Sequence, residues 1–89
     1  MAVKVKRLFM RDTYKYLLKD GNKIVYVGIT NDLERRETEH RQDKNFATME
    51  VVGRRCSRES AERWETNRIE TYMDNHKGET PKFNQTTYG

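Results

Sequence analysis

Residues Val25 to His40, VYVGITNDLERRETEH, contain a strand, a turn and a helix in quick succession. The β-branched and aromatic residues at the start of this stretch predict a strand that ends at Gly28. Asn31 then suits the N-cap of a helix, and Glu34 three residues later completes a capping box. The stretch therefore predicts a strand that passes through a short turn into a helix over residues 32–43.

The predicted helix has an unusual inward face. Leu33 is its only large apolar residue, and Arg36, Glu37 and His40 lie above Leu33 on the same side. The side of a helix that faces the core of a small domain ordinarily carries Leu, Ile or Val. A helix that turns an arginine and a histidine toward its single leucine is expected to line a functional site. The alternative is that Arg36 is solvated and His40 is structural.

The composition is that of a small, highly charged and moderately basic chain. Its 89 residues are 34% hydrophobic and 36% charged, with a formal net charge of +4. This length predicts a single domain over residues 1–89, with one small core. The basic excess is compatible with a polyanionic partner but does not require one.

The sequence predicts neither a disulfide nor a membrane span. Cys56 is the only cysteine, and we expect it to be a half-buried residue at the end of a strand. No window has the length and hydropathy of a transmembrane helix, and Lys4, Lys6 and Arg7 interrupt the N-terminal apolar residues. We therefore expect a cytoplasmic protein without membrane association. His and Cys residues form no cluster that would support a zinc site.

Two further strands are expected around the opening stretch. Residues 13–19 alternate as a strand, and Asp20-Gly21-Asn22 after them is typical of a tight hairpin turn. Residues 46–55 predict the third strand. Residues 2–9 alternate only weakly and suit either a short strand or an ordered arm.

A second helix is expected after the third strand. Ser57 is its predicted N-cap, and residues 75–81 form the loop that follows it. The complete order is β-β-α-β-α. This order predicts the α+β fold class, with a small three-stranded antiparallel sheet flanked by helices.

One carboxylate lies in the middle of the apolar side of this second helix. At about 100° per residue, Glu65 shares its face with four apolar residues: Ala61, Ile69, Tyr72 and Met73. Glu70 is expected on the opposite, solvent side. A buried carboxylate is costly unless it is paired or ligates a cation. From periodicity alone, a salt bridge to Arg36 or Arg68 explains Glu65 as well as a functional site does.

Three tyrosines, Tyr14, Tyr16 and Tyr26, lie on the paired hairpin strands. Aromatic packing across the strands is the simplest explanation of the group. A tyrosine that acts as a base at neutral pH needs a neighbouring cation or metal, because free tyrosine has a pKa of about 10.

These residues together resemble the GIY-YIG nuclease family. Tyr26-Val27-Gly28, with Arg36 and His40 after it, resembles the second half of the family's module, and Thr13-Tyr14-Lys15-Tyr16 resembles the first half. Trp64 to Ile69 and Pro81 to Asn84 are similar to its later motifs. The resemblance covers residues 13–84.

The resemblance implies a metal-dependent endonuclease that hydrolyses phosphodiester bonds. Catalysis is carried over to five residues: Tyr14, Tyr26, Arg36, His40 and Glu65. Substrate binding is carried over to five others: Tyr16, Gly28, Arg35, Arg68 and Asn84. Glu65 would also hold one divalent metal ion, Mg²⁺ or Mn²⁺.

The identity of the first motif tyrosine is open. Counting from the Asp20-Gly21 turn favours Tyr14, whereas counting back from Tyr26 leaves Tyr16 as the alternative. We expect Tyr14 to meet the phosphate held by Arg36, and Tyr16 to pack against the second helix.

The partner that the resemblance implies is nucleic acid, DNA rather than RNA, contacted with weak sequence preference. A partner protein or larger complex would then supply specificity. The alternatives are a nucleic-acid-binding module without hydrolysis and a protein-interaction module on the same fold. Cleavage that requires added metal would separate the nuclease from both.

Overall fold

The computed structural model describes residues 11–84 of the chain. Their elements are, in order, β1 (Thr13–Asp20), β2 (Lys23–Thr30), α2 (Leu33–Asp43), β3 (Thr48–Cys56), α3 (Arg58–Asn75) and the short 3-10 helix η1 (Lys82–Asn84). The strands form one antiparallel sheet in the order β2-β1-β3. The predicted α+β class and the order β-β-α-β-α are confirmed. The arm or strand expected at residues 2–9 lies outside the described residues.

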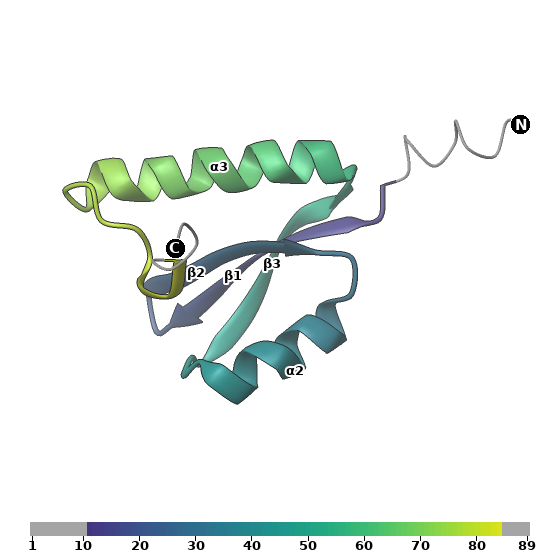
Figure 1. Ribbon diagram of the computed structural model, residues 1–89, viewed down its shortest axis with the longest axis horizontal. Coiled ribbons are helices and arrows are strands. Elements are labelled where there is room, and N and C mark those ends of the chain that lie inside the picture. The colour runs from purple at the N-terminus through teal and green to yellow at the C-terminus, as the bar shows by residue number, and fades with distance from the viewer. Residues whose placement is uncertain (1–10, 85–89) are drawn as a thin grey trace, which may run out of the picture.

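The two longer helices lie on opposite sides of the sheet, as Figure 1 shows. β1 is the central strand, and its residues Tyr16 and Leu18 are fully buried on one face with Val25 and Phe46. Leu17 alternates to the other face. There it pairs across the sheet with the buried Val27 of β2. The core is thus divided between the two faces of one thin sheet.

Three element boundaries differ from the sequence prediction. β2 continues through Gly28 to Thr30, because pairing with β1 extends as far as Tyr14 opposite Thr30. The N-cap of α2 is consequently Asp32 rather than Asn31, and its side chain accepts a hydrogen bond from the Arg35 backbone N–H at 3.1 Å. β3 begins at Thr48.

Two local predictions at the junction of β3 and α3 are confirmed. Ser57 is the N-cap of α3, and its side chain accepts a hydrogen bond from the Ser60 backbone N–H at 3.2 Å. Cys56 is half-buried and ends β3. The junction therefore follows directly from local sequence, because a Ser side chain can satisfy a free N–H at the start of a helix.

Candidate active site

Tyr16 and His40 join the sheet to α2. The Tyr16 hydroxyl oxygen and His40 Nε2 are 2.7 Å apart, and the exposed fractions of the two residues are 0% and 1%. The ring of Tyr26 lies edge-on to His40, with centroids 4.7 Å apart, and its centroid is 6.1 Å from that of Tyr16. Two strands and one helix therefore bring three polar rings into one buried cluster.

Gly28 makes room for this cluster. It pairs with Tyr16 across the two strands, and a Cβ atom at Gly28 would lie 2.5 Å from the Tyr16 hydroxyl oxygen. Such a distance is far inside van der Waals contact. The structure gives Gly28 a packing role, and its predicted role in substrate binding stays a prediction.

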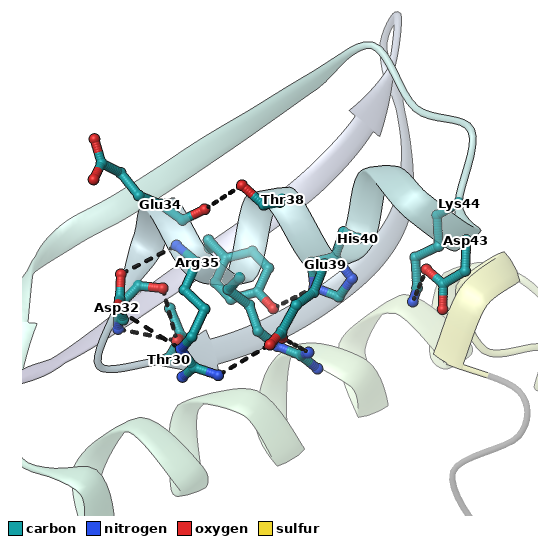
Figure 2. Close-up of polar contacts among 11 residues, drawn as sticks. Thr30, Asp32, Glu34, Arg35, Thr38, Glu39, His40, Asp43 and Lys44 are labelled. Carbon is teal, nitrogen blue, oxygen red and sulfur yellow. Dashed lines mark hydrogen bonds and ion pairs between the residues drawn. The ribbon is translucent and has the colours of Figure 1, made fainter.

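Arg36 projects from the same face of α2, one turn before His40. Its Nη1 donates to Glu39 Oε1 at 2.8 Å, while Arg35 Nη1 donates to Glu39 Oε2 at 3.1 Å. Figure 2 shows Glu39 beside Arg35 on this helix. Partial burial would lower the pKa of Arg36, but the hydrogen bond to Glu39 and the nearby Tyr16 and Tyr26 raise it. Arg36 is therefore a permanent cation beside two phenols.

Glu39 is a site residue that the sequence analysis did not identify. The hydrogen bond from Arg36 holds the pKa of Glu39 below its usual value. Its spacing of three and four residues from Arg36 and Arg35 is the spacing at which helix side chains meet, so this signal was present in the sequence.

Tyr16 and His40 are both neutral at pH 7. Burial, followed by the neighbouring Tyr26, raises the pKa of Tyr16, while Arg36 opposes the rise. Burial, followed by the charges of Arg36 and Lys44, lowers the pKa of His40 to about 4. A neutral imidazole has one N–H and one lone pair. Within residues 11–84, His40 Nδ1 has no hydrogen-bond partner, so the bond to Tyr16 is the single polar contact of this ring.

Glu65 faces a cavity of about 350 Å³ that lies against Tyr26. Ile69 and Met73 also line it, so the carboxylate has apolar neighbours on its own helix. Burial, followed by the charge of Glu62, raises the pKa of Glu65. In the described part of the chain, no hydrogen bond or ion pair reaches its carboxylate.

The salt bridges considered for Glu65 are therefore not formed. Arg36 pairs with Glu39 instead, and Arg68 lines a different hollow, with Ile24 and Tyr72. Glu70 is exposed to solvent, as expected, but it also borders the Glu65 cavity and so is not on the side of α3 opposite to Glu65. The cavity is lined by α3 residues outside the apolar face that helical periodicity predicts, Thr66 and Glu70 among them.

Asn84 fixes the outer edge of β2 next to Tyr26. The Val27 N–H donates to Asn84 Oδ1 at 3.0 Å, and Asn84 Nδ2 donates to the Val27 carbonyl at 3.1 Å. β2 is an edge strand, so these backbone groups have no strand partner on that side. Asn84 was predicted to bind substrate; it is 4% exposed, borders the cavity and holds the strand.

The expectation that Tyr16 packs against the second helix is wrong, because its hydroxyl meets His40 of α2. Tyr14 lies outside the cluster, with the Arg55 guanidinium 6.0 Å from its ring centroid. Tyr16, rather than Tyr14, meets His40 and Tyr26. α2 begins just beyond Thr30, which pairs with Tyr14, and continues until His40 stands over Tyr16. The turn at Asp20-Gly21 could not reveal this, because it fixes only the register of the two strands.

Two predicted substrate-binding arginines also lie apart from the cluster. Arg35 is exposed and forms ion pairs with Asp32 and Glu39, as Figure 2 shows. Arg68 is on the hairpin side of α3, near Asn22 and Lys23. The residues that the structure does bring together are Tyr16, Tyr26, Arg36 and His40, with Glu65 across the adjoining cavity.

The comparison with known families agrees with this geometry. The family model of the GIY-YIG catalytic domain matches residues 13–79. The chain therefore belongs to the GIY-YIG family, a family of nuclease domains, which supports a nuclease-type function in general. Neither the curated proteins nor the solved structures contain a significant match. Within residues 11–84, no helix is long and apolar enough to cross a membrane.

Proposed function

We propose that this chain is a metal-dependent endonuclease that hydrolyses phosphodiester bonds in nucleic acid, with DNA rather than RNA as its substrate. The observation that carries the proposal is the convergence of polar side chains from two strands and two helices. Tyr26 packs against Tyr16 and His40, and it lines one cavity with Glu65. Arg36 lies one turn before His40 on α2, and the nearby Tyr16 and Tyr26 raise its pKa. Such a group joins a fixed cation, proton-transferring hydroxyls and a carboxylate at one place.

Glu65 suits a hard divalent cation such as Mg²⁺ or Mn²⁺. Its carboxylate borders a cavity, and within residues 11–84 it has no hydrogen-bond or ion-pair partner. Those residues hold no group of three or more His, Cys, Asp or Glu side chains suited to a metal. Mg²⁺ does not need such a cage, because it commonly uses one or two carboxylates together with waters and substrate phosphates. When bound, it would stabilise charge on the phosphate and on the leaving oxygen.

Arg36 would bind the non-bridging oxygens of the scissile phosphate. Its planar guanidinium can donate two parallel hydrogen bonds to a phosphate, which lysine cannot. Glu39 accepts from one of its nitrogens and so fixes the direction of the rest. A donor held in place before the reaction stabilises developing charge without the cost of reorganisation.

Tyr26 would be the tyrosine that meets the attacking water. It borders the cavity that Glu65 faces, whereas Tyr16 is fully buried. The Tyr26 hydroxyl oxygen would take a proton from water and pass its own hydroxyl proton to solvent, as the water oxygen bonds to phosphorus and the bond to the leaving oxygen breaks. Tyr16 and His40 would act through Tyr26 by holding its ring, and they are therefore positioning residues.

The contacts proposed for Arg36, Tyr26 and the metal at Glu65 are made with the phosphate and not with the bases. Phosphate contacts give affinity and orientation but carry no sequence information. We therefore expect weak intrinsic sequence preference, with a partner protein or larger complex supplying specificity.

The test is cleavage of labelled DNA and RNA, linear and branched, with Mg²⁺ or Mn²⁺ and in parallel with EDTA. We expect cleavage of DNA only when metal is present. Cleavage that persists in EDTA would contradict the metal assignment. Binding without cleavage of any substrate would instead identify a nucleic-acid-binding module, and neither binding nor cleavage would favour a protein-interaction module.

A further inference from the structure

The pairing of β1 with β3 is interrupted next to Tyr14. The register shifts between Thr13 and Lys15, and Tyr14 alone on β1 stands opposite three residues of β3: Gly53, Arg54 and Arg55. Gly53 has a φ of 64°, a conformation that residues with a side chain rarely adopt. A bulge of this kind redirects side chains. Here it gathers two consecutive arginines around one tyrosine.

These residues line a hollow of about 420 Å³, together with Arg11. The Arg55 guanidinium lies 6.0 Å from the Tyr14 ring centroid, within the range of a cation–π contact. In the part of the chain that the structure describes, none of the three arginines forms an ion pair. Most other arginines do, including Arg35, Arg36 and Arg41. The hollow is therefore a concentration of positive charge without an internal counter-charge.

Lys15 is a fourth cation near Gly53, although it does not line the hollow and alternates to the other face of β1. Its Nζ would lie 3.6 Å from a Cβ atom built on Gly53. A bulky side chain at Gly53 would thus occupy space next to a fourth cation. Guanidinium groups around a concave surface are well suited to a phosphate, because their planar donors match its oxygens.

The hollow also lies beside the candidate active site. Tyr14 precedes Tyr16 by two residues, so both point to the same face of β1, about 7 Å apart along the strand. Base pairs in a duplex are about 3.4 Å apart along the axis. The hollow is therefore displaced from the active-site cluster by a distance on the scale of one or two nucleotide steps.

We propose that the hollow over Tyr14 binds a backbone phosphate of the nucleic-acid substrate, close to but distinct from the phosphate at Arg36. This inference rests on the proposed function and extends it, since it names a second contact on the substrate. Arg54 and Arg55 are the residues that hold this phosphate, and Tyr14 orients Arg55. The contact sets the register of the strand on the protein without reading its bases.

The test is the salt dependence of binding to a short fluorescein-labelled DNA duplex, measured by fluorescence anisotropy without added metal. All proteins carry Glu65→Gln, so that cleavage does not interfere. We expect Arg54→Gln/Arg55→Gln to weaken binding and to reduce the slope of log Kd against log salt by about one, as for the loss of one phosphate contact. The single substitution Arg54→Gln should act in the same direction and serves if the double variant does not fold.

The control is Lys23→Gln/Lys77→Gln, which removes two exposed positive charges, one at the hairpin end of the sheet and one just after α3. It should leave the slope unchanged. The inference would be overturned if the arginine variants kept the wild-type slope, or if the lysine control reduced the slope as much as the arginine variants do. Cleavage by the wild-type chain is measured separately. If the wild-type chain cleaves DNA but the arginine variants keep the full salt slope, only the proposed phosphate site in the hollow is rejected. If the arginine variants show a reduced slope but the wild-type chain does not cleave, only the proposed nuclease activity is rejected.

Discussion

A Cβ atom on Gly28 would lie 2.5 Å from the hydroxyl oxygen of Tyr16 and 2.6 Å from Cε2 of Tyr26. One glycine on β2 therefore sets the space for both tyrosines of the cluster. Gly28→Ala should destabilise the fold by about 1–3 kcal/mol, the usual cost of overpacking, and should also abolish cleavage. Urea unfolding and a cleavage assay measure the two effects.

Gly21→Ala is the control for this substitution. Gly21 lies in the hairpin turn with a φ of 69°, and no atom lies within 4 Å of its Cβ position. We expect this variant to lose stability through backbone strain but to keep its activity per folded molecule. Full activity in Gly28→Ala would contradict the packing role of Gly28.

The two tyrosines of β1 should respond differently to loss of the hydroxyl. Tyr14→Phe keeps the ring beside Arg55 and should cleave at the wild-type rate. Tyr16→Phe leaves His40 Nε2 buried without its partner, which should cost about 1–3 kcal/mol in unfolding free energy and reduce cleavage. An inactive Tyr14→Phe beside an active Tyr16→Phe would restore the assignment based on the hairpin turn.

Stability should depend on pH through His40. Its pKa is about 4 in the folded chain and about 6.5 in an unfolded one. Between these values the unfolded state binds more protons, so stability should fall as the pH decreases from about 6.5 to about 4, by up to about 3 kcal/mol. Urea unfolding across this range measures the effect.

His40→Gln isolates this contribution, because it removes the titrating group and keeps every other one. The difference between wild type and variant should shrink as the pH falls through this window. A difference that is constant from pH 7 to pH 4 would show that His40 is not buried in its neutral form.

Loss of the Arg36 side chain should reduce the rate of cleavage much more than the affinity for DNA. Removal of a preorganised donor to developing charge costs about 10²–10³ in rate, whereas a single phosphate contact among several contributes little to affinity. We expect Arg36→Ala to show this loss in kcat with DNA affinity nearly unchanged. Arg35→Ala is the matched control, since Arg35 pairs with the same Glu39 but is exposed. Equal losses in affinity and rate would make Arg36 a general docking residue.

Local sequence patterns were sufficient to predict the strands and helices and some of the residues of the candidate site. The alternation in residues 13–19, the Asp-Gly turn and the unusual face of α2 predicted the hairpin and the inward direction of Arg36 and His40. Helical periodicity also identified Glu65 as an anomaly. These features depend on neighbours a few residues away, which are visible in the sequence.

Contacts over longer sequence separations were not predictable in the same way. Tyr14 and Tyr16 share one face, so alternation cannot decide which of them meets His40, 24 residues further along. The hydrogen bonds between Asn84 and Val27 span 57 residues. The bulge at Gly53 depends on how β3 pairs with β1. Each of these depends on tertiary packing, which overrides local preference.

The most direct test of the account is the effect of Glu65→Gln on DNA cleavage in Mg²⁺, compared with Glu59→Gln on the same helix. The Glu59 side chain is 85% exposed, whereas Glu65 is partly buried and has no ion-pair partner within residues 11–84. We predict that Glu65→Gln folds with at least wild-type stability and does not cleave, while Glu59→Gln cleaves normally. Cleavage by Glu65→Gln at the wild-type rate would contradict the account.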